Sequence, residues 1–179
     1  IWNHRTATAN NLKSTLDKEM AGRAVSFSVA DKVEEATADA DLIVTATMSR
    51  TPVLSDAPKG SHIMGVGACV KDWAEMSSDL MRKSAVFVDS FSGARTESGD
   101  IILSGCEIHA ELGQVIDGAS EGRRNDSEIT VYKSLGMAVQ DLIAAKMIFD
   151  SFTKSTSDKK DAAETRVVPT WWVPSAKVV

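Results

Sequence analysis

The hydrophobic positions change their spacing several times in the first forty residues. Ile1-Trp2 is typical of the end of a buried strand, and apolar residues four apart then predict a helix over residues 6–20. Apolar and polar residues alternate from Ala24 to Val29, which predicts a further strand. Asp31 and Glu34 have the spacing of a capping box and predict a short helix that opens at Asp31.

Three continuous apolar runs follow, and each predicts a strand covered on both faces, as in a parallel sheet. The runs are residues 41–46, 62–66 and 85–89. A loop punctuated by prolines over residues 48–60 separates the first two, and a polar helical stretch over residues 73–83 separates the last two. Strands that alternate with helices and crossing loops favour an α/β fold with a doubly wound parallel sheet.

The pattern changes after Asp89. Residues 91–96 and 107–116 are typical of short helices, and residues 128–132 of a strand. The longest predicted helix spans residues 134–152, with Ser134 as its N-cap and an apolar side that we expect to pack against another element. Residues 154–179 are polar and without period at first, then rich in Pro and Trp, and we expect a loosely ordered tail.

Composition and charge exclude some classes of binding partner. The 179-residue chain has a formal charge of −5 and 43% hydrophobic residues, so we expect a soluble protein that does not bind nucleic acid. No apolar run approaches the roughly 20 residues that a membrane helix needs, so no membrane partner is expected. Cys69 and Cys106 have neither metal-ligand nor disulfide spacing, which favours a reducing compartment such as the cytoplasm.

Glycine motifs give an incomplete signal. The chain has eleven glycines but neither G-x-G-x-x-G nor a Walker loop, and Gly65-Val-Gly67-Ala is only the first half of a dinucleotide fingerprint. These glycines could instead let a strand end pass close to a neighbouring backbone. Small or polar residues follow three predicted strands, at residues 3–6, 45–47 and 65–68, and α/β sheets bind their ligands at such carboxyl ends.

The first of these strand ends indicates a cofactor. A Rossmann domain that uses NAD places an acid after its second strand, whereas one that accepts NADP supplies cations there for the 2′-phosphate. If Ile1-Trp2 ends the second strand, Asn3 stands in the acid position, and His4 and Arg5 follow it. This predicts a preference for NADPH, with NADH as a possible substitute. A solvated polar turn that opens a helix remains the alternative.

Other reactive side chains have simpler interpretations. His62 and His109 lie in apolar patterns typical of core or boundary histidines, and Glu97 and Asp100 flank a Ser-Gly turn. Cys69 could be a nucleophile, although a small side chain beside a glycine turn fits it as well. No Ser/His/Asp order and no pair of carboxylates stands out, so no catalytic residue is assigned.

Taken together, a co-linear series of motifs resembles the ornithine cyclodeaminase/mu-crystallin family. The series is Ile1-Trp-Asn3, Asp41-Leu-Ile-Val-Thr-Ala-Thr47, Gly65-Val-Gly-Ala68 with Asp72-Trp73, Val88-Asp-Ser90, Glu97-Ser-Gly-Asp100, Ala110-Glu-Leu-Gly113 and Tyr132-Lys-Ser-Leu-Gly136. The resemblance covers residues 1 to about 153. It implies a Rossmann-type domain at residues 1–133 that lacks its first strand and glycine-rich loop. Residues 134–153 would then be a helix of the substrate and dimerisation domain.

The resemblance also implies site residues. The turn that contacts NADP falls on Asn3, His4 and Arg5, although the family pattern is Asn-Arg-Thr, which shifts the positions of the cations. Thr47 and Val66 match positions that line the nicotinamide half of the cofactor, and Ser134 matches a serine that contacts it. Two further residues match the substrate or hormone pocket, where the family's mu-crystallin branch binds thyroid hormone. These two are Cys69 and Glu97.

One departure separates the branches of the family. The cyclodeaminases carry a catalytic aspartate after the glycine turn and a lysine four residues later, and here these positions hold Cys69 and Trp73. The resemblance therefore implies NADPH-dependent reduction of a small cyclic imine carboxylate, a ketimine, rather than ornithine cyclisation. The alternatives are a binding protein for thyroid hormone and NADPH, and an NAD-dependent cyclodeaminase. The family forms homodimers and takes basic substrate-binding residues from an amino-terminal domain, so we expect an inactive carboxy-terminal fragment.

Overall fold

The computed structural model describes residues 1–157, which divide into two units, Ile1–Gly136 and the segment that begins at Met137. The helices and strands in chain order are α1 (Thr6–Glu19), α2 (Val33–Thr37), β1 (Leu42–Thr45), β2 (His62–Gly65), α3 (Ser78–Lys83), β3 (Ala85–Val88), α4 (Phe91–Glu97), α5 (Gly99–Ser104), β4 (Ile108–Glu111), α6 (Leu112–Ile116), β5 (Thr130–Lys133) and α7 (Ala138–Ser157). The expected tail at residues 154–179 lies mostly outside the described residues.

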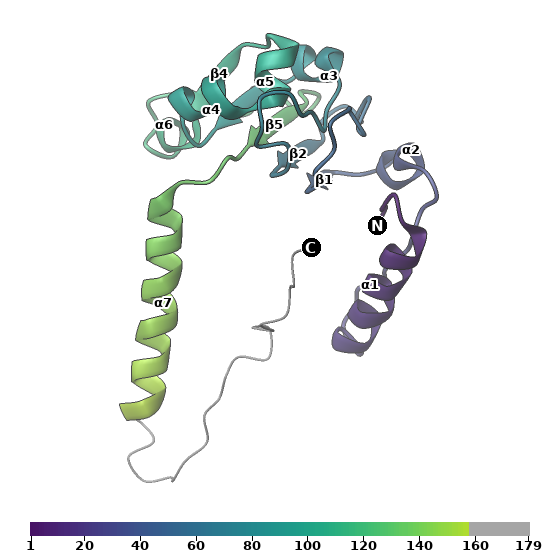
Figure 1. Ribbon diagram of the computed structural model, residues 1–179, viewed down its shortest axis with the longest axis vertical. Helices are drawn as coiled ribbons and strands as arrows, with labels where there is room; N and C mark the ends of the chain where they lie inside the picture. Colours follow the sequence, from purple (N-terminus) through teal and green to yellow (C-terminus); the bar gives the residue numbers. More distant parts are fainter. Residues whose placement is uncertain (158–179) are drawn as a thin grey trace. The chain divides into compact units, whose positions relative to one another are not determined.

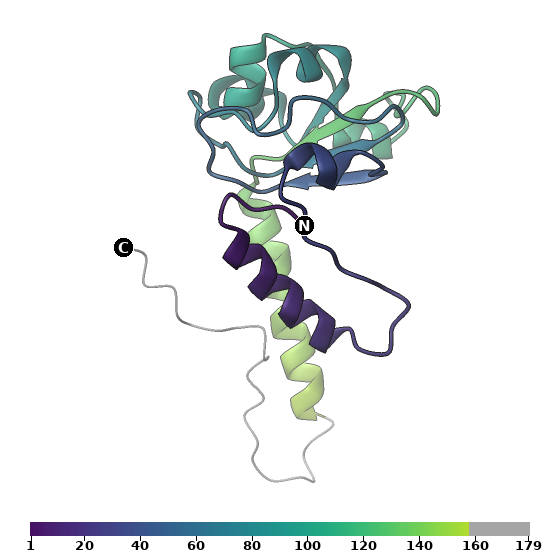
Figure 2. The same cartoon turned by 90° about the vertical axis from the view of Figure 1, so that its right-hand side faces the viewer.

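The first unit is built on one parallel sheet of five strands in the order β1-β2-β5-β3-β4 (Figure 1). The inward residues of this sheet pack against buried side chains of α3, α4 and α5, among them Leu80, Ala94 and Ile101. Figures 1 and 2 both show the teal helices α3 and α5 on the same side of the sheet. The parallel α/β sheet predicted from the apolar runs is thus confirmed.

The opposite face of the sheet is covered by a smaller hydrophobic cluster. Phe87 and Ala110 pack with Val115 of α6 on this face. Leu42 and Val44 of β1 are 57% and 58% exposed, so the prediction that this strand is covered on both faces is wrong. Because β1 is an edge strand, it has a partner strand on one side only.

The two strands predicted before β1 are not regular strands. Ile1 donates its amino group to the Ser28 carbonyl at 2.8 Å and accepts from the Ala30 N–H at 2.9 Å, which is the bonding of a parallel pair. The helix predicted after Ile1-Trp2 is confirmed as α1. The short helix after Asp31 is also present as α2, but Lys32 is its N-cap and makes no side-chain cap.

Three other predicted elements differ from the structure. Residues 107–116 form a strand and a short helix, β4 and α6, because Ile108 and Ala110 turn inward at alternate positions beside β3. The helix predicted from residue 73 begins only at Ser78, after Ser77 caps the Leu80 N–H. Gly99 and Asp100, which were interpreted as part of a turn, are the first two residues of α5.

The long helix α7 begins four residues later than predicted. Ser134 is not its N-cap, because Gly136 follows in the left-handed region at φ 86°, where a right-handed helix cannot continue. Apolar side chains of α7 are exposed, with Leu142 at 68% and Met147 at 67%. The packing of this apolar side against another element stays a prediction. Among residues 1–157, no helix combines the length and the apolar character needed to cross a bilayer.

Candidate functional site

The carboxyl ends of β1 and β2 continue as two turns that run side by side. The Val66 N–H donates to the Thr45 carbonyl at 2.9 Å, and the Ala68 N–H donates to the Thr47 carbonyl at 3.3 Å. Ala68 has φ 49°, in the left-handed region that a residue other than glycine seldom adopts. Both turns therefore lie at one edge of the sheet, where α/β proteins bind their ligands.

A buried glutamate joins these two turns. The Glu75 side chain is fully buried and accepts hydrogen bonds from the Thr45 hydroxyl at 2.8 Å and from the Gly67 N–H at 2.9 Å. Its second oxygen accepts from the Thr47 N–H. A Cβ atom at Gly67 would overlap the Thr47 carbonyl and the Glu75 carboxylate. Glycine is therefore required at position 67 by the close approach of the two turns.

A buried lysine holds the same glycine from its other side. Lys133, the last residue of β5, is fully buried and donates from Nζ to the Gly67 carbonyl. Its ammonium also lies 3.2 Å from Oδ2 of Asp100, as an ion pair without the geometry of a hydrogen bond. Oδ1 of Asp100 accepts from the backbone N–H groups of Glu75 and Met76 at 2.7 and 2.9 Å.

Burial is the largest influence on the pKa of the Asp100 carboxyl. Burial raises the pKa of this carboxyl above its ordinary value, and the Met76 N–H and the Lys133 ammonium partly offset that rise. Glu75, Lys133 and Asp100 form what we call the strand-end network. It links β1, β2, β5 and α5 through buried charged groups. A buried charge is tolerated only with such partners.

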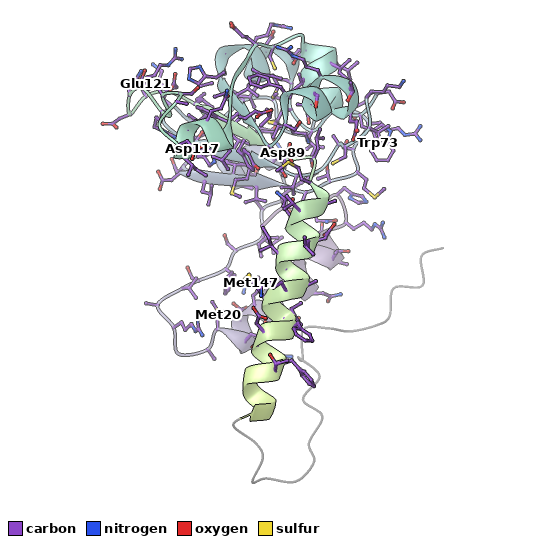
Figure 3. The ribbon with its side chains drawn as sticks, turned by 90° about the vertical axis from the view of Figure 1, so that its left-hand side faces the viewer. Met20, Trp73, Asp89, Asp117, Glu121 and Met147 are labelled. Carbon is purple, nitrogen blue, oxygen red and sulfur yellow. The ribbon has the colours of Figure 1, made fainter. Side chains whose placement is uncertain are left out.

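A second carboxylate fixes the turn after β5. Asp89 follows β3, and its Oδ2 accepts from the backbone N–H groups of Leu135 and Gly136 at 2.8 and 2.7 Å and from the Ser134 hydroxyl at 3.2 Å. The Ser134 N–H donates to the Gly65 carbonyl at 3.0 Å, which places this turn beside β2. Asp89 is labelled in Figure 3, at the edge of the sheet where the chain leaves β5.

The turn that precedes α1 has a local hydrogen-bond pattern of its own. Oδ1 of Asn3 accepts from the Arg5 N–H at 2.9 Å, and Arg5 Nε donates to His4 Nε2 at 3.1 Å. That nitrogen of His4 is therefore the unprotonated one in this arrangement. Arg5 is the N-cap of α1 but makes no side-chain cap, and no acid lies in the first turn of the helix.

The structure brings together some of the predicted site residues. Thr47, Val66 and Ser134 lie at the carboxyl edge, and Cys69 joins them through a thiol contact to the Val66 carbonyl at 3.6 Å. Glu97 is the exposed last residue of α4. Within residues 1–157, no hydrogen bond connects Glu97 or the Asn3–Arg5 turn to this edge.

Sequence reasoning missed the strand-end network and Asp89. Asp100 was interpreted as a turn residue, but it is buried in α5. Lys133 carried a usable signal, because a lysine at an inward position of a buried strand requires a buried acceptor. Two hollows of about 290 and 540 Å³ in the described chain lie elsewhere, one beside α2 and one on the sheet face near His62 and Tyr132. The same part of the chain contains no group of three or more metal-binding side chains.

The parallel sheet with polar turns at its carboxyl edge defines an α/β protein of the Rossmann-like class. A family model for the ornithine cyclodeaminase/mu-crystallin family matches residues 1–156, and the chain belongs to that family. The expected family and fold class are thus both confirmed.

Two curated relatives and one solved structure illustrate the similarity. The chain is 42% identical over 155 residues to a ketimine reductase mu-crystallin from Mus musculus, covering 86% of this chain and 47% of the relative. It is 41% identical over 130 residues to a Δ1-pyrroline-2-carboxylate reductase from Bacillus thuringiensis, covering 68% and 40%. The Δ1-pyrroline-2-carboxylate reductase of Thermococcus litoralis, solved with NADH and L-proline, superposes with a TM-score of 0.79 at 32% identity, covering 87% and 50%. The chain thus spans about half the length of the curated relatives that it matches.

Proposed function

We propose that residues 1–136 bind a nicotinamide dinucleotide along the carboxyl edge of the sheet, and that the protein reduces cyclic imine carboxylates. The observation that carries the proposal is the convergence of the turns after β1, β2 and β5 at this edge. Their residues Thr47, Val66 and Ser134 are those assigned to the cofactor. Relatives named as ketimine and pyrroline-2-carboxylate reductases support the reaction class.

The Asn3–Arg5 turn fits the phosphate end of NADPH. The first N–H groups of α1 have no intrahelical acceptor and carry the positive end of the helix dipole. Arg5 uses Nε toward His4, and no hydrogen bond in the described chain uses its two terminal nitrogens. Because no acid lies in the first turn, these donors would meet a 2′-phosphate without repulsion. This chemistry favours NADPH over NADH.

The nicotinamide end would lie against Thr47 and Val66. The bound cofactor supplies the hydride for the C=N carbon, and the chain orients the ring and excludes water on its side. Cys69 places a thiol beside this edge, at the position where a cyclodeaminase would have an aspartate. The proposed reaction is therefore reduction of a preformed cyclic imine and not ornithine cyclisation.

The test measures NADPH oxidation by the natural gene product with Δ1-pyrroline-2-carboxylate and its six-membered analogue. We expect substrate-dependent loss of nicotinamide absorbance, faster with NADPH than with NADH. Arg5→Gln should reduce the NADPH preference about tenfold, through the loss of one charge-assisted phosphate contact. Lys18→Gln, at the other end of α1, is the control and should leave the preference unchanged. Absence of turnover together with tight iodothyronine binding would favour the hormone-binding alternative.

The exposed apolar side of α7 supports a related proposal, that this helix belongs to the substrate and dimerisation domain. Leu142, Ile143 and Met147 are each more than half exposed, and Met147 is labelled in Figure 3. An apolar surface of this kind is typical of an interface. Size measurement by light scattering tests it, and a monomer at micromolar concentration would contradict the dimer.

A further inference from the structure

The turns at the carboxyl edge lie beyond the paired strands, and the Val66 and Ala68 N–H groups join them by hydrogen bonds to the Thr45 and Thr47 carbonyls. β1 ends at Thr45 and β2 at Gly65, so the residues that would meet the cofactor lie beyond the last paired positions. The left-handed φ of Ala68 adds backbone strain of about 1 kcal/mol or more, which persists only when surrounding contacts fix the conformation. Side-chain contacts must therefore act together with these two backbone hydrogen bonds to set the position of the turns.

The strand-end network makes those contacts. The N–H of Gly67 donates to Glu75, and the C=O of the same residue accepts from Lys133. Glu75 also accepts from the Thr47 N–H, so one carboxylate determines the spacing between the two turns. Asp100 in turn fixes the backbone of Glu75 and lies beside the Lys133 ammonium.

Stability alone is a poor reason for such a network. Replacing buried ion pairs by well-packed apolar side chains is often neutral or stabilising, because removing charges from water costs several kcal/mol for each ion. Three fully buried charged side chains at one sheet edge are better explained by a need for exact backbone placement. Directed charged hydrogen bonds fix peptide positions in a way that apolar packing does not.

We propose that Glu75 and Lys133 are positioning residues that hold the Thr47 and Gly67 backbone in the geometry that receives the nicotinamide ring. The inference rests on the proposed function and deepens it, because it assigns the specificity of the nicotinamide end to buried side chains behind the turns. The phosphate end of the cofactor is held by the Asn3–Arg5 turn, which these side chains do not contact. The two ends of the cofactor therefore respond differently to changes in the network.

The experiment compares two ligands in the natural gene product. NADPH contains both ends of the cofactor, whereas 2′,5′-ADP contains the phosphate end without the nicotinamide. Glu75→Gln replaces an acceptor oxygen by an NH₂ group that faces N–H donors, and Lys133→Met leaves the Gly67 carbonyl without its donor. We expect each variant to weaken NADPH binding about tenfold or more, with less than about a twofold change for 2′,5′-ADP.

Control variants separate positioning from general loss of stability. Glu35→Gln and Lys59→Met make the same chemical changes at exposed positions and should leave both affinities unchanged. Met81→Ala removes a buried side chain from α3, so it should lower the melting temperature without changing the ratio of the two affinities.

A milder variant covers the case in which the charge changes prevent folding. Thr45→Val keeps the shape of the side chain but removes the 2.8 Å hydrogen bond to Glu75, and we expect a selective NADPH loss of about two- to fivefold. Equal losses for both ligands, or none for either, would overturn the positioning role. Failure of the unchanged protein to bind NADPH would instead overturn the proposed function.

Discussion

Asp89 offers a direct test of how the turn after β5 is fixed. Replacing it with alanine removes the oxygen that accepts from the N–H groups of Leu135 and Gly136 at 2.8 and 2.7 Å and from the Ser134 hydroxyl at 3.2 Å. The bond from the Ser90 N–H is also lost, but it is local to the adjacent residue.

The expected cost follows from the two long-range backbone bonds. A hydrogen bond to a charged group contributes about 1.5–3 kcal/mol, and the lower value applies here because Gly136 is exposed. Two such bonds give a loss of about 3 kcal/mol for Asp89→Ala. Asp89→Asn keeps one acceptor oxygen without the charge, so we expect about half that loss.

The assay is urea unfolding at neutral pH, read as a shift in the midpoint at constant slope. Asp79→Asn is the matched control, because Asp79 is a 91% exposed carboxylate whose ion pair with Arg82 should contribute less than about 0.5 kcal/mol. A change below about 0.5 kcal/mol for Asp89→Ala would refute the reasoning, since it would mean that water replaces the carboxylate at no cost.

Three further predictions follow from single residues. Gly67→Ala should destabilise the protein by about 3 kcal/mol or more in thermal unfolding, because its methyl group would overlap two neighbours, whereas Gly113→Ala, with open space around it, should not. Burial and then a nearby guanidinium lower the pKa of His62 below 6.5, so the native state binds fewer protons than the unfolded chain and its stability falls as pH drops below about 6.5. His62→Gln should lack that fall in a series of melting curves, and an unchanged pH dependence would contradict the assignment. Burial and then Asp89 raise the pKa of Tyr132, the single tyrosine, so Asp89→Asn should lower the midpoint of its ultraviolet titration, and a constant midpoint would count against this.

The sequence predicted four of the five strands of the sheet but not their order. Continuous apolar runs predicted β1, β2 and β3, because strands of a parallel sheet carry little polar alternation, although one face of β1 proved to be exposed. β4 was missed because Ile108 and Ala110 are as compatible with a helix as with a strand. The strand order could not be predicted, since β5 pairs between β2 and β3 although it follows them by many residues.

Residues of the candidate site were predicted only where a family motif marks them in the sequence. Thr47, Val66 and Ser134 were assigned to the cofactor from the family resemblance, and the structure places all three at the carboxyl edge. Glu75 gave no such signal, and the position of Lys133 in an apolar strand indicated a buried acceptor without indicating which residue it is. Their role depends on burial and on contacts between residues far apart in the chain.

The central claim is that a nicotinamide dinucleotide binds along the carboxyl edge of the sheet. The most direct measurement is amide hydrogen exchange of the protein with and without saturating NADPH, resolved to short peptides. The account predicts slower exchange at residues 3–6, 45–48, 65–69 and 134–136, with little change on the sheet face near His62 and Tyr132. Protection on that face alone, or no protection at the strand ends, would contradict it.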